Sequence, residues 1–293
     1  MHSSFCFIVN TLANRGKAAH LFKGQIEFIK HNFPDARFIY IKEKDPIEEH
    51  VQWAAKHHKY VVAAGGDGTV QQVAKALIST RATLGVLPLG SGNDFAKSLG
   101  LTSQLETDLQ VLHQRKTVSV DVIKTNSGYF LNTFGIGLDG LTNYYSSKSS
   151  LKTAVTRYFV SALKALFRSG KFDYECIIDG EKAAGKSWMI IVANGAVEGG
   201  RYEISPESDN TDGVCEVVIV RDISVQRLLV EFLKLSVGLP FSEKVVLKKR
   251  FKSSVSIALD SSIYAHADGE IVEPTDHFSF RIEKQALRVI VSG

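Results

Sequence analysis

The segment YVVAAGGDGTVQQVAKAL (residues 60–77) decides the fold of this 293-residue chain. It opens with a continuous apolar run of strand length, which is typical of a parallel strand buried on both faces. Two consecutive glycines follow, and then a stretch in which apolar residues recur with the 3.6-residue period of a helix. The apolar face of this stretch consists of Val70, Val73, Ala74, Leu77 and Ile78. The segment therefore predicts a strand, a tight loop and an amphipathic helix.

The same alternation fills the first 100 residues. Apolar runs of strand length occur at 5–9 (FCFIV), 37–41 (RFIYI), 60–64 (YVVAA) and 84–89 (LGVLPL). Helices are predicted over about 18–30 and 47–58, after the glycine loop, and shortly before Gly100. Strands that alternate with helices at this spacing imply βαβ units and a mainly parallel sheet.

Beyond Val118 the chain is rich in short β-type runs bounded by turn signals such as Asn-Ser-Gly and Asp-Gly. This pattern predicts an antiparallel β-sandwich or barrel interrupted by two helices. We place the domain boundary near residue 123, which gives an α/β domain over 1–123 and a β-sandwich domain over 124–293. The last strand is free to pack back near the first domain. The cleft between two abutting domains is the expected ligand site.

Composition excludes several classes of protein. Hydrophobic residues make up 44% of the chain and charged residues 23%, which is typical of a globular protein. Lys and Arg number 35 against 31 Asp and Glu, and a net charge of +4 is not the dense basic stripe of a nucleic-acid-binding protein. Three separate cysteines favour a reducing compartment over a disulfide framework or a zinc site. We find no signal peptide and no transmembrane segment, so a cytoplasmic location is expected.

The first glycine loop, Gly65–Thr69, has the chemistry of a phosphate cradle. Consecutive glycines bring backbone N–H groups close to a ligand, and the helix behind the loop presents its N-terminus, which favours an anion. Asp67 is unusual there, because a carboxylate repels phosphate unless a divalent metal or a proton-transfer role justifies it. A plain glycine turn is the simpler alternative.

A second loop, LGSGND (residues 89–94), follows the next strand of the sheet. It combines two glycines and the Ser91 hydroxyl with Asn93 and Asp94, which can cap the helix that comes next. Because the two loops follow neighbouring parallel strands, we expect them to form two walls of one phosphate pocket at the carboxyl edge of the sheet.

These residues resemble a known family, the catalytic domain of diacylglycerol kinases and their bacterial lipid-kinase relatives. The resemblance spans the chain in order and rests on Asn10, GGDGT (65–69), LPLGSGNDFAKSLG (87–100), Asp121, FGIGLD (134–139), Asn194, PESDNTDG (206–213) and ADGE (267–270). It implies an N-terminal α/β domain like that of NAD kinase and phosphofructokinase, a C-terminal antiparallel β-sandwich, and an active site in the cleft between them. This agrees with the domain division predicted from the pattern of strands and helices.

The resemblance also implies two substrate sites and a cofactor. ATP would contact Asn10, Gly65, Gly66, Asp67, Gly68, Thr69, Val70, Gln71, Gln72, Ser91, Gly92 and Asn93. The family usually has Thr where this chain has Ser91, which keeps the hydroxyl, whereas the loop after Asn10 departs from the family pattern. Glu270 would be the base that takes the proton of a lipid hydroxyl, and Asp67 would act beside it.

Carboxylates at further positions match acidic residues of the family. Asp94 and Asp121 correspond to an acidic network organised by Mg²⁺. Asp209, Asp212 and the backbone carbonyl of Val214 correspond to a structural metal site, and an oxygen-rich turn is what Mg²⁺ prefers.

Two sequence features imitate functional motifs. Asp179-Gly180-Glu181 is a second Asp-Gly-Glu, and both copies are predicted to be hairpin turns, so only family position favours Glu270 over Glu181. Gly135–Gly140 fits the dinucleotide pattern G-x-G-x-x-G, but no carboxylate follows about 20 residues later. We therefore interpret these glycines as a close-packed segment of the cleft.

A basic amphipathic helix is predicted within residues 148–171. Its apolar stripe runs through Leu151, Ala154, Val155, Tyr158, Phe159, Ala162, Leu163, Leu166 and Phe167. The segment carries Lys148, Lys152, Arg157, Lys164, Arg168 and Lys171 and no acidic residue. Such a helix can lie on an anionic membrane, or the stripe can simply pack on the sandwich. A second basic run, 244–252, is either a further membrane contact or an edge strand protected by lysines.

The predicted protein is an ATP- and Mg²⁺-dependent lipid kinase that phosphorylates a diacylglycerol-like or sphingoid lipid. It would be cytoplasmic with peripheral association with the membrane, and the sequence leaves open whether two copies form a homodimer. One alternative is an NAD kinase-like small-molecule kinase, since that family shares the GGDGT loop. Another is a non-catalytic lipid-binding homologue.

Overall fold

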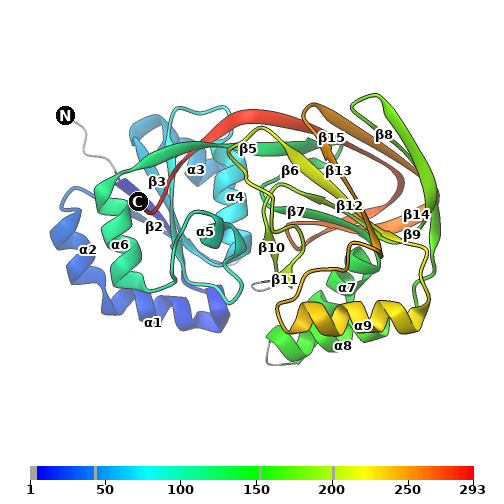
Figure 1. Cartoon of the computed structure of the whole chain (residues 1–293). Helices are drawn as coiled ribbons and strands as arrows, with labels where there is room; N and C mark the ends of the chain where they lie inside the picture. Colours follow the sequence, from blue (N-terminus) through cyan, green and yellow to red (C-terminus); the bar gives the residue numbers. More distant parts are fainter. Residues whose placement is uncertain (1–4, 43–44, 152–153, 200–201) are drawn as a thin grey trace. The chain divides into compact units, whose positions relative to one another are not determined.

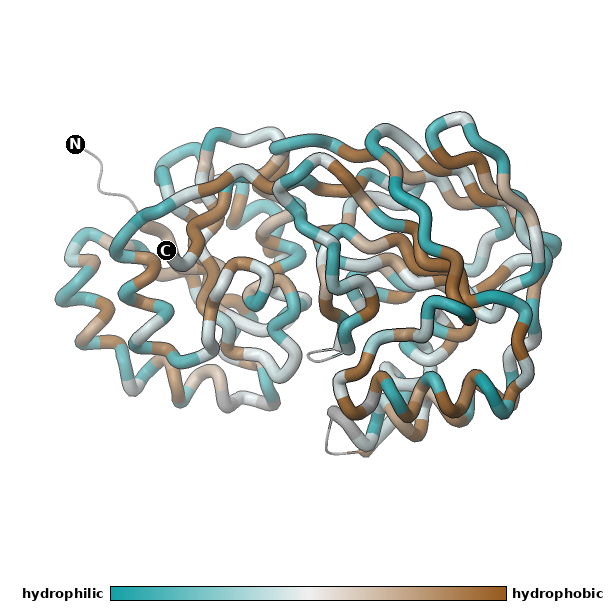
Figure 2. The backbone as a smooth tube through the Cα atoms, in the orientation of Figure 1, coloured by the Kyte–Doolittle hydropathy of each residue, from teal (hydrophilic) through white to brown (hydrophobic). Residues whose placement is uncertain are grey.

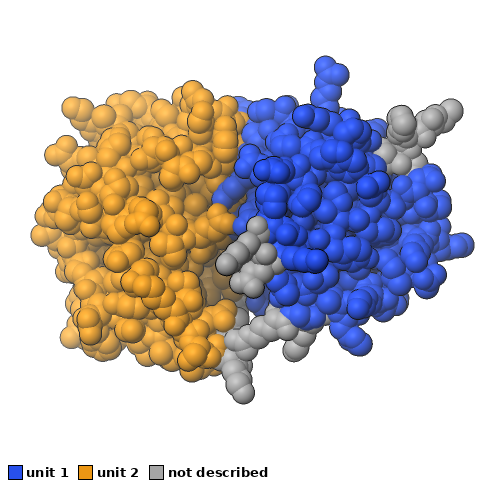
Figure 3. Space-filling model, turned by 180° about the vertical axis from the view of Figure 1, so that it is seen from behind, with its two compact units in different colours: residues 1–121, 284–293 blue, residues 122–283 orange. Residues whose placement is uncertain are grey.

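The computed structural model describes residues 5–42, 45–151, 154–199 and 202–293. The chain divides into two compact units (Figure 1, Figure 3). Unit 1 comprises residues 1–121 together with 284–293, and unit 2 comprises residues 122–283. The C-terminal residues therefore belong to the same unit as the N-terminal ones.

Unit 1 is built on a parallel sheet, as predicted. Its strands are β1 (Phe5–Asn10), β2 (Arg37–Ile41), β3 (Tyr60–Gly65) and β4 (Thr83–Pro88), paired in the order β2-β1-β3-β4. The end of β15 (Glu270–Ile290) adds a parallel strand beside β4, with Val289 opposite Leu84. Every residue of β3 and β4 is buried, which explains why these strands are continuous apolar runs in the sequence (Figure 2).

Helices connect these strands and differ from the prediction in two places. They are α1 (Lys17–Gly24), α2 (Ile26–Asn32), α3 (Ile47–His57), α4 (Asp67–Leu77), α5 (Asp94–Ser98) and α6 (Leu105–Gln114). The single helix predicted over 18–30 is wrong, because the backbone at Gln25 leaves helical geometry (φ −108°, ψ 6°) and separates α1 from α2. Helix α6 was not predicted. It buries Leu112, whose side chain lies beside Gly85 of β4.

Unit 2 is an antiparallel β-sandwich, as predicted. Its strands are β5 (Thr117–Thr125), which begins in unit 1, β6 (Gly128–Phe130), β7 (Thr133–Gly137), β8 (Phe172–Ile178), β9 (Glu181–Ala193), β10 (Val197–Glu198), β11 (Tyr202–Glu203), β12 (Cys215–Arg221), β13 (Val246–Phe251), β14 (Ser254–Ala267) and most of β15. The main path is β13-β12-β9-β7-β14-β15. Strand β8 pairs with the first half of β9 and with the first half of β14, so both long strands contribute to two layers.

The two faces of β9 pack against different cores. Ile190 and Val192 point into a cluster inside the sandwich, whereas Met189, Ile191 and Ala193 point into a second cluster. This second cluster is covered by α7 (Leu138–Ser147), α8 (Ala154–Leu166) and α9 (Val225–Ser236). The prediction of two helices in this domain is therefore wrong, since the described part of unit 2 has three.

The structure places the two basic segments that were considered as membrane contacts. The basic run at 244–252 contains β13, which pairs with β12 alone and ends the strand order, so it is an edge strand carrying Lys248 and Lys249. Helix α8 covers only part of the predicted 148–171 segment, and Lys152 lies outside the described residues. Among the described residues, no helix is long and apolar enough to cross a membrane.

Candidate functional site

The two glycine loops of unit 1 lie side by side at the carboxyl edge of the parallel sheet. Strands β3 and β4 pair in register up to Gly65 and Pro88, the last residue of each. Beyond them the Leu89 N–H donates to the Gly65 carbonyl at 2.8 Å. The sequence-based expectation of adjacent loops on neighbouring strands is therefore confirmed, and helix α4 begins within the first loop, at Asp67.

Glycine is required where the loops touch. A Cβ atom on Gly90 would lie 2.6 Å from the Cα of Gly66, a distance that no side chain tolerates. A Cβ atom on Gly92 would lie 2.8 Å from Oδ2 of Asp67 and 3.8 Å from Oδ1 of Asp94. Bare backbone is thus needed for the close approach, and both carboxylates lie beside Gly92.

Asp67 ties the two loops together. Its Oδ2 accepts the N–H of Asn93 and its Oδ1 accepts the N–H of Asp94, both at 2.8 Å. Asp94 is the first residue of α5, so the Asp67 carboxylate lies at the N-terminus of this helix, where negative charge is stabilised. Asp67 was predicted to need a metal or a proton-transfer role. The structure gives its carboxylate a positioning task as well.

Other predicted nucleotide-binding residues separate into buried supports and accessible groups. Asn10 donates to the Thr69 hydroxyl at 2.9 Å, and the Asn93 side chain accepts the Gly90 N–H at 3.0 Å, so these polar side chains brace the loops. The buried members of the predicted set are Gly65, Thr69, Val70, Gln71 and Asn93. Those at least partly exposed are Asn10, Gly66, Asp67, Gly68, Gln72, Ser91 and Gly92.

Asp121 has a partner of its own in unit 1. It is 1% exposed, and its Oδ1 accepts the N–H of Gln285 at 2.8 Å. Gln285 has a positive φ of 51°, which is rare for a residue with a side chain. The carboxylate therefore fixes an unusual backbone conformation where β15 runs through unit 1.

The two Asp-Gly-Glu copies are hairpin turns of the same kind, as predicted. Asp179 and Gly180 join β8 to β9 with φ values of 46° and 91°, and Asp268 and Gly269 join β14 to β15 with φ values of 50° and 85°. Each aspartate accepts three backbone N–H groups, Asp179 from residues 252–254 and Asp268 from residues 131–133. Local geometry therefore does not distinguish the copies.

Their surroundings differ strongly. The side chain of Glu181 is 79% exposed and lies 3.6 Å from Lys249 at the edge of the sheet. Glu270 is partly buried, and the turn before it contacts His266, which is fully buried. The Gly269 N–H donates to Nδ1 of His266 at 3.0 Å.

His266 belongs to a buried charged cluster that was not predicted from the sequence. Its Nε2 lies 2.9 Å from Asp139 and 3.1 Å from Glu198. Burial by itself would lower the pKa of His266, but the two carboxylates raise that pKa well above its usual value, and burial raises the pKa of Glu198. Because Nδ1 accepts the Gly269 N–H, the ring proton lies on Nε2 between the two carboxylates, and a metal ion would have to displace it. The sequence signals for this cluster were Asp139, which ends the FGIGLD segment, and a histidine two residues before the second Asp-Gly-Glu.

The G-x-G-x-x-G segment explains how this cluster fits. A Cβ atom on Gly135 would lie 2.0 Å from Oδ2 of Asp139 and 2.5 Å from Nε2 of His266. A Cβ atom on Gly140 would lie 2.2 Å from the carbonyl oxygen of Tyr264. The glycines serve close packing, which agrees with the rejection of a dinucleotide site.

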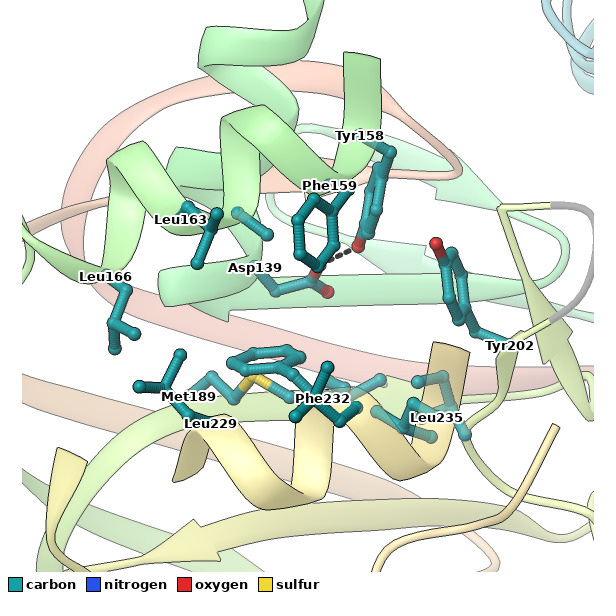
Figure 4. Close-up of a pocket in the computed structure, with 14 residues that line it drawn as sticks. Asp139, Tyr158, Phe159, Leu163, Leu166, Met189, Tyr202, Leu229, Phe232 and Leu235 are labelled. Atoms are coloured by element: carbon teal, nitrogen blue, oxygen red, sulfur yellow. Dashed lines mark hydrogen bonds between the residues drawn. The ribbon is translucent and has the colours of Figure 1, made fainter. Parts of the chain in front are cut away.

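An apolar pocket opens between α8 and α9 of unit 2 (Figure 4). Its empty volume, including the open mouth, is about 850 Å³. It is lined by Asp139, Tyr158, Phe159, Ala162, Leu163, Leu166, Met189, Ile191, Tyr202, Ile204, Leu229, Phe232, Leu233 and Leu235. Its one carboxylate, Asp139, accepts the Tyr158 hydroxyl at 3.1 Å, so the pocket is apolar with a single polar corner.

The pocket refines the interpretation of the predicted amphipathic stripe. Leu166 is 5% exposed and packs on the core while it also lines the pocket, together with Tyr158, Phe159 and Leu163. Phe167, directly after α8, is 78% exposed. The side chains of residues 154 and 155 lie outside the described part of the structure. The apolar stripe of α8 therefore both covers the sandwich and lines the pocket.

Asp209 and Asp212 stand exposed in one tight turn before β12. Asp209 accepts the N–H of Thr211 at 2.9 Å, and Asp212 accepts the N–H of Val214 at 2.8 Å. Both carboxylates therefore bond to the backbone of their own turn, and carboxylate oxygens are ligands that suit a hard divalent cation.

Paired glycine loops at the carboxyl edge of a parallel sheet, followed by an antiparallel β-sandwich, define a two-domain protein whose first domain has the features of a phosphate-binding site. Residues 4–125 match the family model for the diacylglycerol kinase catalytic domain. Residues 132–291 match the model for the YegS C-terminal NAD kinase beta sandwich-like domain. The chain belongs to this diacylglycerol kinase family with a YegS-type C-terminal domain, which confirms the resemblance found in the sequence.

Individual relatives agree with this assignment. The chain is 32% identical to a probable lipid kinase YegS-like protein of Pectobacterium atrosepticum over 59% of each chain. It is 30% identical to a diacylglycerol kinase of Bacillus subtilis over 62% of this chain and 60% of the relative, so these alignments span about three fifths of the relatives' length. A solved structure of a putative diacylglycerol kinase from Bacillus anthracis superimposes with a TM-score of 0.82 at 22% identity, covering 99% of this chain and 97% of the other. That likeness confirms the fold.

Proposed function

We propose that this protein transfers the γ-phosphate of ATP to a hydroxyl of a diacylglycerol-like or sphingoid lipid in a Mg²⁺-dependent reaction. The apolar pocket of unit 2 is the observation that carries the proposal. Thirteen of its fourteen lining residues are hydrophobic or aromatic, and such a surface accepts an alkyl chain but not a dinucleotide. Asp139 and Tyr158 supply the polar corner that a hydroxyl-bearing lipid needs.

ATP would be held by the glycine loops of unit 1. The accessible backbone of Gly66, Gly68 and Gly92 and the hydroxyl of Ser91 are suited to phosphate oxygens, and the N-terminus of α4 favours their negative charge. Asn10, Thr69 and Asn93 would act through the loops that they brace. The bond network of Asp67 would keep the two loops at a fixed spacing during phosphoryl transfer.

Glu270 is the proposed base that takes the proton of the lipid hydroxyl. Its partial exposure suits contact with a substrate, and the turn that carries it is fixed by Asp268 and by the Gly269–His266 bond. Asp67 is the proposed second catalytic carboxylate. Asp94 and Asp121 remain the proposed acidic network, with Asp94 beside Asp67 and Asp121 bonded to the β15 backbone.

Two magnesium sites form part of the proposal. Asp209, Asp212 and the Val214 carbonyl are the proposed ligands of a structural ion, and Asp94 beside Asp67 is the proposed carboxylate pair nearest the phosphates. When bound there, the ion would neutralise charge on the phosphate oxygens.

We further propose a cytoplasmic protein that associates peripherally with the membrane, with basic residues of the 148–171 segment facing anionic lipid. Arg157, Lys164 and Arg168 are the described basic residues within or next to α8. A homodimer is compatible with the proposal but is not needed for it.

One experiment tests the activity and two variants test the base. The protein is incubated with [γ-³²P]ATP, Mg²⁺ and either total membrane lipid or NAD, and the labelled product is identified. Labelled lipid supports the proposal. Labelled NADP would support the NAD kinase-like alternative, and no product on a broad lipid panel would support the non-catalytic homologue.

For the base, Glu270→Gln and Glu181→Gln are compared, because the two glutamates follow turns of the same geometry. We expect a loss of about 10²-fold or more in kcat for Glu270→Gln, in the range of general-base contributions, and normal turnover for Glu181→Gln. Retained turnover in the Glu270→Gln protein would reject the assignment.

A further inference from the structure

Large hydrophobic side chains are exposed mainly on one pair of segments. The described residues expose fifteen such side chains, and eight of them lie within 159–167 and 225–239. They are Phe159, Val160, Phe167, Val225, Val230, Leu233, Val237 and Leu239. These segments hold α8, α9 and the residues that directly follow each helix. An exposed apolar patch of this kind marks an interaction site.

Helix α9 has an apolar stripe on each of two faces. Leu228 and Leu235 are almost completely buried in the core of unit 2. Val230, Leu233 and Val237, spaced at i, i+3 and i+7, fall on another face and are 46%, 56% and 73% exposed. A helix that only covers a core needs one apolar face, so the second stripe has a different partner.

The exposed charged side chains of α8 and α9 themselves are all basic. The only acidic residue of α9, Glu231, is fully buried and forms salt bridges with Arg227 and Lys234. No acidic residue occurs between residues 148 and 171, and Lys164 and Arg168 are exposed on and after α8. The outer faces of both helices therefore combine apolar side chains with positive charge.

The mouth of the apolar pocket lies within the same patch. Phe159 of α8 and Leu233 of α9 line the pocket and are also 42% and 56% exposed. Figure 4 shows the side chains of the two helices facing one another across the pocket. An alkyl chain that leaves or enters the pocket must therefore pass between the exposed apolar faces.

We propose that the exposed faces of α8 and α9 form one docking surface that rests on an anionic lipid bilayer, so that the substrate moves from the bilayer directly into the pocket. Apolar side chains enter the boundary between headgroups and acyl chains, and the basic side chains contact anionic headgroups. The proposal rests on the proposed function for the identity of the substrate. The proposal adds α9 to the membrane contact expected of the 148–171 segment, and it places this contact at the mouth of the pocket.

A second copy of this chain fits the patch less well than a bilayer does. A twofold interface places the same surface of both copies together, so the basic residues of one copy would face those of the other. No exposed acidic side chain of α8 or α9 compensates this repulsion. An anionic membrane supplies the opposite charge.

The test compares two double variants in vesicle sedimentation without ATP. Phe167→Ser/Val237→Ser removes the most exposed apolar side chain of each segment, and neither residue lines the pocket. Leu21→Ser/Ile177→Ser is the matched control, because these side chains are 48% and 45% exposed on α1 and β8. We expect at least tenfold weaker binding of the first variant to vesicles of phosphatidylcholine with 30% phosphatidylglycerol, wild-type binding of the control, and weaker binding of every protein at high salt.

Kinase assays on two forms of substrate complete the test. With diacylglycerol embedded in these vesicles the Phe167→Ser/Val237→Ser protein should lose activity, while a short-chain diacylglycerol dissolved as monomers should be phosphorylated at the wild-type rate. Unchanged vesicle binding in this variant overturns the proposal, as does a wild-type dimer in gel filtration that the variant loses while it still binds vesicles. Vesicle binding without phosphorylation of any lipid would leave the surface in place and reject the proposed function instead.

Discussion

The two Asp-Gly-Glu turns offer a sharp prediction about stability, because one local structure occurs in two environments. Asp268 accepts the N–H groups of Leu131, Asn132 and Thr133 at 2.7, 2.8 and 3.0 Å, and these residues are 0%, 4% and 1% exposed. Asp179 accepts three N–H groups as well, at 2.6 to 3.0 Å, but residues 252–254 that donate them are exposed.

The expected cost follows from what the donors can do when the carboxylate is removed. In Asp268→Ala three buried N–H groups lose a charged acceptor, and each such loss costs about 1–3 kcal/mol, so with partial relaxation we expect about 4 kcal/mol of lost stability. In Asp179→Ala water can replace the carboxylate, so we expect a loss of about 1 kcal/mol. The free energies of unfolding should therefore differ by about 3 kcal/mol.

Urea unfolding of unit 2 provides the measurement. Trp188 lies in unit 2 and is 5% exposed, whereas Trp53 lies in unit 1, so a Trp53→Phe background makes fluorescence report on unit 2. Each alanine variant is compared with this parent at the same pH and temperature. Equal losses for the two variants would refute the argument, because they would show that burial of the donors does not set the cost.

Three further predictions follow from particular contacts. Gly90→Ala should destabilise unit 1 by about 1–3 kcal/mol and abolish ATP binding in a calorimetric titration, because its Cβ would lie 2.6 Å from the Gly66 Cα. Gly24→Ala is the control, because a Cβ there meets open space and Gly24 lies outside both glycine loops. Burial alone would raise the pKa of Glu231, but the Ser242 N–H and Lys234 lower it, so stability in acid titrations should be lost as the pH falls below about 4.5, and a Glu231→Gln protein should show a weaker acid dependence. Burial raises the pKa of Cys6 to about 11, and Cys176 and Cys215 are also buried. A thiol reagent at pH 8 should therefore label the native chain far more slowly than the urea-unfolded chain, in which three cysteines should react. Rapid labelling of the native chain would contradict this prediction.

The first hundred residues show how far sequence patterns predict this fold. Strand β2 begins and ends at the predicted residues 37 and 41, and both glycine loops lie where strand-length apolar runs end. Helix α6 was not predicted, although Leu105, Leu109 and Leu112 recur with a helical spacing in its sequence. The break at Gln25 was missed because the apolar pattern continues through Ile26 and Ile29, although Gly24, a typical helix-ending residue, is the last residue of α1.

Among the candidate site residues, those set by local sequence were predictable and those brought together by tertiary packing were not. The glycine loops were predictable because a phosphate cradle needs backbone conformations that local sequence specifies. Asp139, Glu198 and His266 were not predictable as a cluster, because residues 127 positions apart meet only when α7 and β14 pack together. The pocket was hidden for a similar reason, since its lining residues follow the same apolar patterns as the core on either side of it.

The two turns summarise the division between sequence and tertiary structure. Sequence by itself determined the family, the order of the two domains, and the fact that both Asp-Gly-Glu copies form hairpin turns, because positive φ at Asp and Gly is a local preference. Only the tertiary structure decided that one turn is backed by buried backbone and His266 while the other lies at an exposed edge. The physical reason is that burial and electrostatic partners come from residues far along the chain, which no local pattern specifies.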